Sequence, residues 1–169
     1  MTVHRTAHAG PFLFAGSDLW AEEDLEACRA AALFLAQHAP APTFEKVSAL
    51  FYLADRAHLS RYGALICGGT YEAMRHGPTP GPLLTLTRQG LDLTAGAAPD
   101  MEELSPAALE VMGEVLALYG EDAPEEVSAR TRGEDWKTCP PGLPMTAAHI
   151  ARTLPNARAV LEHLADPHP

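Results

Sequence analysis

One stretch of the sequence, residues 43–63, constrains the fold of this chain more than any other. Its apolar side chains recur at intervals of three and four residues, the spacing of one face of an α-helix. Thr43 stands before them as a helix N-cap, and Gly63 follows where a left-handed stop is expected. The pattern predicts a helix of about five turns that is buried on one face. The side chains expected at the centre of the core are Phe44, Val47, Leu50, Phe51 and Ala54.

Other segments carry the periodicity or the boundary residues of helices. Residues 22–38 have acidic side chains in the first turn, where the helix dipole favours them, and Pro40 follows their end. Ser105 followed by Pro106 is a strong helix start, and an apolar face then continues to Gly120. Shorter helices are expected over residues 124–131, 147–154 and 156–164.

A short antiparallel hairpin is predicted within residues 83–94. Two apolar runs, 83–87 and 91–94, flank a turn that contains Gly90. The preceding run, residues 77–82, is rich in prolines, which lack the amide hydrogen that a continuous helix or a central strand needs. The predicted fold is therefore mainly α, an irregular helical domain with a small antiparallel β-hairpin on the borderline of α+β.

The domain organisation follows from length and patterning. The chain has 169 residues, and we expect a flexible arm over residues 1–18 followed by a single domain over residues 19–169. The arm has apolar side chains with which to dock, namely Phe12, Leu13 and Phe14. No apolar stretch approaches the ~20 residues that a bilayer span needs, and no export signal is evident, so we expect a cytoplasmic protein without membrane contact.

The charge of the chain excludes some partners. Twelve Lys and Arg oppose 22 Asp and Glu, which gives a net charge of -10 with His neutral. A surface of this sign repels a nucleic-acid backbone, so a regulatory nucleic-acid binder is disfavoured. A basic protein surface would be attracted at long range, which raises the rate of encounter.

The residues that could act in catalysis or metal binding do not form a complete catalytic set. Asp55 and His58 lie three residues apart on the long predicted helix, but a catalytic zinc site needs three protein ligands, and no HExxH motif is present. The cysteines form no CxxC pair, and no base is identified for the thiol of Cys139. We expect no enzyme activity, metal or cofactor. The alternative is a small metal-dependent or thiol enzyme that uses Asp55, His58 and His76.

The pattern of residues 46–84 is more specific. It consists of a Tyr-x-Ala-Asp-x-x-His-Leu core, a glycine exit, a Tyr-x-Ala and a Gly-Pro, here Tyr52, Ala54, Asp55, His58, Leu59, Gly63, Tyr71, Ala73, Gly77 and Pro78. Farther along, Ser105, Tyr119, Gly120, Ser128 and Trp136 continue the series. In this order and spacing, residues 22–164 resemble the Panacea domain of SocA-like antitoxins. Two departures are Arg132, where the family often has a His, and Gly69, where it has an Asp.

The resemblance implies a domain that neutralises a cognate toxin by direct binding, often encoded beside it or on a mobile genetic element. Large aromatic and arginine side chains supply most of the binding energy in such interfaces. The candidate contact residues are Tyr71, Arg75, His76 and Trp136. Core packing remains an equal alternative for the two aromatic residues, and a homo-oligomer is left open. The loop of residues 75–80 is expected to be rigid and to position Tyr71 and His76.

Overall fold

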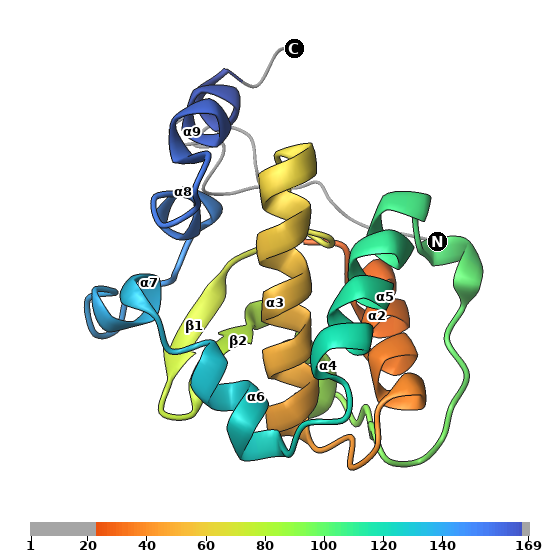
Figure 1. The fold of residues 1–169 in the computed structure, drawn as a ribbon. Coiled ribbons are helices and arrows are strands. Elements are labelled where there is room, and N and C mark those ends of the chain that lie inside the picture. Colours follow the sequence, from red (N-terminus) through yellow and green to blue (C-terminus); the bar gives the residue numbers. More distant parts are fainter. Residues whose placement is uncertain (1–22, 167–169) are drawn as a thin grey trace.

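Helix α3 (Phe44–Tyr62) is the central element of the structure, a computed structural model that describes residues 23–166 (Figure 1). The remaining α-helices of this part of the chain are α2 (Leu25–His38), α4 (Gly81–Arg88), α5 (Pro106–Tyr119), α6 (Pro124–Arg130), α7 (Glu134–Lys137), α8 (Ala147–Ala151) and α9 (Ala157–Ala165). A 3₁₀ turn, Met101–Glu103, precedes α5. The fold is mainly α with one small sheet, as predicted.

The ends of the predicted helices are confirmed by their caps. The Thr43 hydroxyl accepts the Lys46 backbone N–H at 3.1 Å, and Gly63 ends α3 with a φ of 74°. The Asp24 carboxylate accepts the Ala27 N–H at the start of α2, and the Ser105 hydroxyl accepts the Ala108 N–H at the start of α5. Each of the three side-chain caps satisfies a backbone donor that the first turn leaves unpaired.

Helix α3 separates two apolar clusters. Val47, Leu50, Phe51 and Ala54 are fully buried in the first cluster, where α3 packs with α2, α4 and α5, while Phe44 is half-buried at its edge. The second cluster joins α3 to the sheet and to α8 and α9, and includes Ile150 and Val160. Figure 1 shows this arrangement, with α2 and α5 on one side of α3 and the strands, α8 and α9 on the other.

The predicted position of the hairpin is wrong. Residues 81–88 form helix α4, while the two antiparallel strands lie earlier, at β1 (Tyr71–Met74) and β2 (Gly77–Pro80). The run of residues 83–87 alternates like a strand, yet Leu83 and Leu86 also have helical spacing and both are buried. Pro82 favours the helix, because its missing N–H belongs to the unpaired first turn.

The strand β2 tolerates two prolines because of its register. Pro78 and Pro80 face Ala73 and Tyr71 across the pair, at positions where no hydrogen bond runs between the strands. Tyr71 instead exchanges two backbone hydrogen bonds with Met145, of 2.9 and 2.7 Å. This bridge ties the hairpin to the chain segment that leads into α8.

Some expectations fall outside what the structure describes or are met in part. The arm of residues 1–18, with Phe12, Leu13 and Phe14, precedes residue 23 and is not described. Cys28, Cys67 and Cys139 are free thiols, the first two buried. Over residues 23–166 no helix combines the length and the apolar character that crossing a membrane requires.

Candidate partner-binding site

A buried carboxyl group fastens the hairpin to α3. The Asp55 side chain accepts the Tyr71 hydroxyl at 2.5 Å and the Ile66 backbone N–H at 2.6 Å, and Asp55 is only 2% exposed. Burial raises the pKa of Asp55 to about 7, although both hydrogen bonds act to lower it. Burial and the nearby Asp55 charge also raise the pKa of Tyr71. The pair places β1 against the helix.

A second buried carboxylate fastens α7 to the same helix. Tyr52 donates its hydroxyl hydrogen bond to Asp135, and the Arg56 guanidinium lies 3.5 Å from the same carboxylate. Arg56 also donates to the Thr153 hydroxyl at 2.7 Å, which connects the network to the turn after α8. Burial, followed by the charge of Asp135, raises the pKa of Tyr52. The hydroxyl of Tyr52 therefore stays protonated and keeps donating at neutral pH.

Helix α7 presents Trp136 beside the hairpin. The Trp136 backbone N–H donates to the Asp135 carboxylate at 2.9 Å, and its indole N–H donates to the Met74 carbonyl at 2.8 Å. The His149 ring lies 2.8 Å from the Asp135 carbonyl oxygen, which adds a contact with α8. Trp136 is half-buried, so one part of its ring is fixed and another part is exposed to solvent.

The turn between the strands is held by the end of α6. The His76 carbonyl accepts hydrogen bonds from the Ser128 hydroxyl and from the Arg132 guanidinium, the latter at 2.8 Å. Gly77 has a φ of +140°, and a Cβ atom there would lie 2.5 Å from the Thr131 hydroxyl. Only glycine fits this conformation and this contact without displacement. The expectation that the turn is structurally fixed therefore has a physical basis.

The comparisons with known proteins can be set beside this geometry. A family model described as antitoxin SocA-like, Panacea domain, matches residues 50–137, slightly more than half of the chain. The chain belongs to this Panacea family. Neither a curated protein nor a solved structure matches it. The matched span runs from the middle of α3 to the last residue of α7, so it contains the hairpin and both buried carboxylates.

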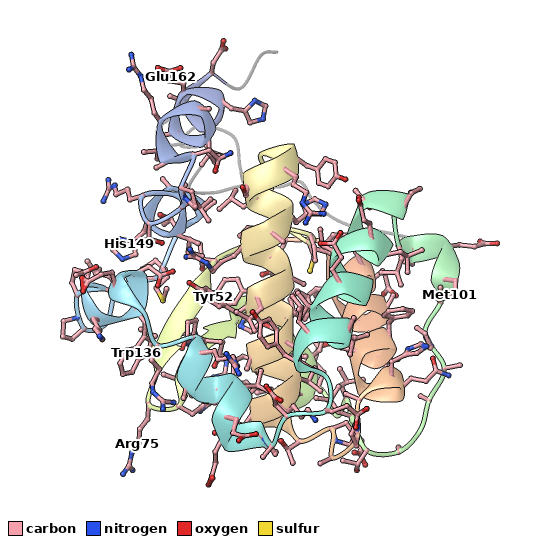
Figure 2. All side chains as sticks on the ribbon, viewed as in Figure 1. Tyr52, Arg75, Met101, Trp136, His149 and Glu162 are labelled. Carbon is pink, nitrogen blue, oxygen red and sulfur yellow. The ribbon has the colours of Figure 1, made fainter. Side chains whose placement is uncertain are left out.

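The Panacea domain brings three of the four sequence-predicted contact residues to one end of the molecule. Arg75 is exposed at the turn of the hairpin, and His76 beside it is half-buried against Phe44, with ring centroids 6.3 Å apart. Figure 2 shows Arg75 extending away from the protein, with Trp136 on the same side of the molecule. We call Arg75, His76 and Trp136 the hairpin surface. Tyr71 is only 1% exposed and lies beneath this surface.

A shallow depression and a groove border the hairpin surface. The depression, of about 450 Å³, is lined by Glu45, Arg75, His76, Glu125 and Arg132. The groove, of about 510 Å³, runs beside β1 and is lined by Thr70, Glu72, Ala73, Trp136, Cys139 and residues 140–144. We call the second of these the edge groove. The edge groove combines polar groups with apolar wall, as partner-binding surfaces do, whereas the side chains that line the depression are charged or polar.

The three residues of the alternative enzyme hypothesis have separate structural roles. The His58 ring lies 2.7 Å from the Ala64 carbonyl oxygen, just after the end of α3. The Asp55 carboxyl group accepts a hydrogen bond from the Tyr71 hydroxyl. His76 lies in the turn before β2. Within residues 23–166, no three His, Cys, Asp or Glu side chains gather as a metal ion would require. The geometry of this part of the Panacea domain thus provides no shared centre for the three.

Sequence reasoning missed the residues that hold the surface in place. In the sequence, Tyr52 stands out only as part of the family pattern. Arg56 and Asp135 are not among the predicted site residues. Tyr52 and Asp135 are 83 positions apart, so no local spacing predicts their contact. The one available signal was that Asp135 precedes Trp136. Arg132, a departure from the family pattern, contacts the hairpin turn through its guanidinium.

Proposed function

We propose that this chain is an antitoxin that neutralises a cognate toxin protein by forming a direct complex with it. The observation that carries the proposal is the family match over residues 50–137. This match spans all of the elements that build the hairpin surface. The proposed action is by binding and not by catalysis, in the cytoplasm, on a toxin encoded beside the antitoxin.

The hairpin surface is the proposed contact region. Arginine and tryptophan are enriched among residues that dominate binding energy, and Arg75 and Trp136 supply both here. The indole of Trp136 is held by its hydrogen bond to the Met74 carbonyl on β1, so less conformational entropy is lost when a partner covers it. Tyr71 lies inside, and in this proposal it positions β1 through Asp55 without touching the toxin.

The charge of the chain supports a toxin whose contact surface is basic. With a net charge of -10, the antitoxin attracts such a surface over distances of roughly a Debye length, about 8 Å at physiological salt. Attraction of this kind mainly raises the association rate. At the hairpin itself the depression is lined by both signs of charge, with Glu45 and Glu125 beside Arg75 and Arg132, so the matching toxin surface would carry both basic and acidic groups there.

The experiment is co-expression with the product of the neighbouring gene. Wild-type chain is expected to restore growth and to co-purify with that product. Arg75→Glu reverses a charge at an exposed position of the hairpin surface and is expected to weaken the complex about tenfold or more, equivalent to about 1.4 kcal/mol. The matched control is Arg158→Glu on α9, where the arginine side chain is 91% exposed and forms only an i,i+4 surface pair with Glu162.

Two results contradict the proposal. The first is a neighbouring product that does not impair growth when it is expressed alone. The second is rescue of growth without any detectable complex, since neutralisation would then proceed by another route. Equal loss of binding in Arg75→Glu and Arg158→Glu would leave direct binding standing but remove the hairpin surface as its location.

A further inference from the structure

Strand pairing along the outer edge of β1 stops at Ala73. Tyr71 directs both its N–H and its C=O away from β2, because both bond to Met145. In an antiparallel pair this direction alternates, so Ala73 directs its own N–H and C=O to the same outer edge. None of residues 23–166 forms a backbone hydrogen bond with Ala73 on that edge. With respect to the described part of the chain, the edge therefore offers one unpaired donor and one unpaired acceptor.

The chain itself turns away from this position. If pairing continued from Met145 in register, Leu143 would stand opposite Ala73. The Leu143 N–H instead donates to the Pro140 carbonyl at 3.1 Å, and Pro144 has no N–H to contribute. Leu143 is left 57% exposed. The divergence between β1 and residues 140–144 opens the edge groove, which has Trp136 in its lining.

The lining of the edge groove indicates what would fit. Apolar wall is provided by Trp136, Leu143 and the prolines at positions 140, 141 and 144. Glu72 is the charged member of the lining, and it is exposed. A complementary segment would be extended, would place an apolar side chain against Trp136 or Leu143, and would direct a basic side chain toward Glu72.

We propose that the edge groove receives an extended segment of the toxin, which pairs with Ala73 as an added strand and continues the bridge begun by Met145. The inference rests on the proposed antitoxin function and specifies how part of the complex is formed. Main-chain hydrogen bonds to a sheet edge supply affinity in such pairing, while the side-chain contacts supply specificity. The proposed partner segment has apolar and basic side chains and binds in an extended conformation.

The test is a matched pair of substitutions at Ala73. Ala73→Pro removes the outward N–H, and the fold should tolerate it because Ala73 donates no bond to Pro78 across the sheet. Ala73→Ser keeps the N–H and is of similar size. Both variants and the wild type are titrated with the product of the neighbouring gene and with overlapping synthetic peptides that cover its sequence. We expect Ala73→Pro to bind about tenfold or more weakly, and Ala73→Ser to bind like the wild type.

Hydrogen exchange of the Ala73 amide in the wild-type complex provides a second measurement that does not depend on the folding of the proline variant. Slower exchange in the complex than in the isolated chain is expected. A folded Ala73→Pro variant with unchanged affinity, or an Ala73 amide whose exchange is unaltered in the complex, would overturn strand addition and leave the antitoxin function standing. Failure of the wild type to bind the neighbouring product overturns both. Protection of Ala73 by self-association of the chain would assign the groove to a second copy and also overturn the inference.

Discussion

Asp55 is a carboxyl group that folding has removed from water, and no positively charged side chain of residues 23–166 forms an ion pair with it. It accepts hydrogen bonds from Tyr71 and Ile66. A hydrogen bond with Cys28, then burial, raises the pKa of the nearby Cys67 thiol, and the charge of Asp55 adds to this effect. The cost of ionising it in this environment is what raises its pKa to about 7. A residue that joins the hairpin to α3 thereby makes stability depend on pH.

The sign of that dependence follows from proton linkage. Between pH 4 and 7 the unfolded chain has lost the Asp55 proton, since the ordinary pKa is 3.8, while the folded chain retains it up to about 7. Raising the pH through this interval therefore favours unfolding, by up to about 4 kcal/mol, and above it the contribution is constant. In Asp55→Asn this contribution is absent. The melting temperature of the variant minus that of the wild type should rise from pH 4 to 7 and then level off.

The control for this titration is Asp92→Asn. Asp92 is exposed, and hydrogen bonds from Thr94 lower its pKa, so between pH 5 and 7 it is ionised in both the folded and the unfolded state. The melting temperature of Asp92→Asn minus that of the wild type should be constant between pH 5 and 7. The measurement is thermal unfolding across the same buffers. If the melting-temperature difference between Asp55→Asn and the wild type is also flat, burial does not raise the pKa of Asp55.

At the scale of elements, α3 carries the largest share of the packing. Leu50 is completely buried between α3 and its neighbours in the first cluster, so Leu50→Ala should lower the free energy of unfolding by about 2 to 5 kcal/mol. The measurement is urea unfolding followed by circular dichroism. Leu118→Ala on α5 is the matched control, because Leu118 is 68% exposed and its truncation should change stability by about 0.5 kcal/mol or less. Equal losses in the two variants would contradict the assigned core.

The elements also show where prediction from sequence succeeded and where it failed. Helices were located because Thr43, Ser105 and the glycines after α3 and α5 act through neighbours three or four residues away. The hairpin was misplaced because residues 83–87 satisfy two periodicities, and packing against α2 decided between them. Signals that are local in sequence were therefore predictable, while choices made by packing were not.

The contact surface was predictable only in part. Arg75, His76 and Trp136 were proposed from residue type and family resemblance, and they lie at one end of the molecule. Their role in binding stays a prediction. The interior position of Tyr71 and the Tyr52–Asp135 contact depend on segments far apart in the sequence, which no local pattern describes.

At the scale of the whole molecule, the two clusters differ in how firmly they hold their elements. Helix α3 contributes to both clusters, whereas α9 buries Val160 alone among its residues. Local opening requires little free energy where few apolar contacts are lost. Hydrogen exchange followed by mass spectrometry should therefore find that the amides of α9 exchange faster than those of α3. Equal protection of α3 and α9 would indicate that the molecule opens only as one unit.

The contact between Tyr52 and Asp135 has a consequence for the order of events during synthesis. Translation proceeds from the N-terminus, so α3 leaves the ribosome well before Asp135 exists, and 83 positions separate the two partners. Until α7 emerges, α3 and β1 are present without the Trp136 side chain that they hold in place in the finished fold. A growing chain is thus without its tryptophan-bearing face, and any ligand that needs this face must wait for nearly the full polypeptide to be made.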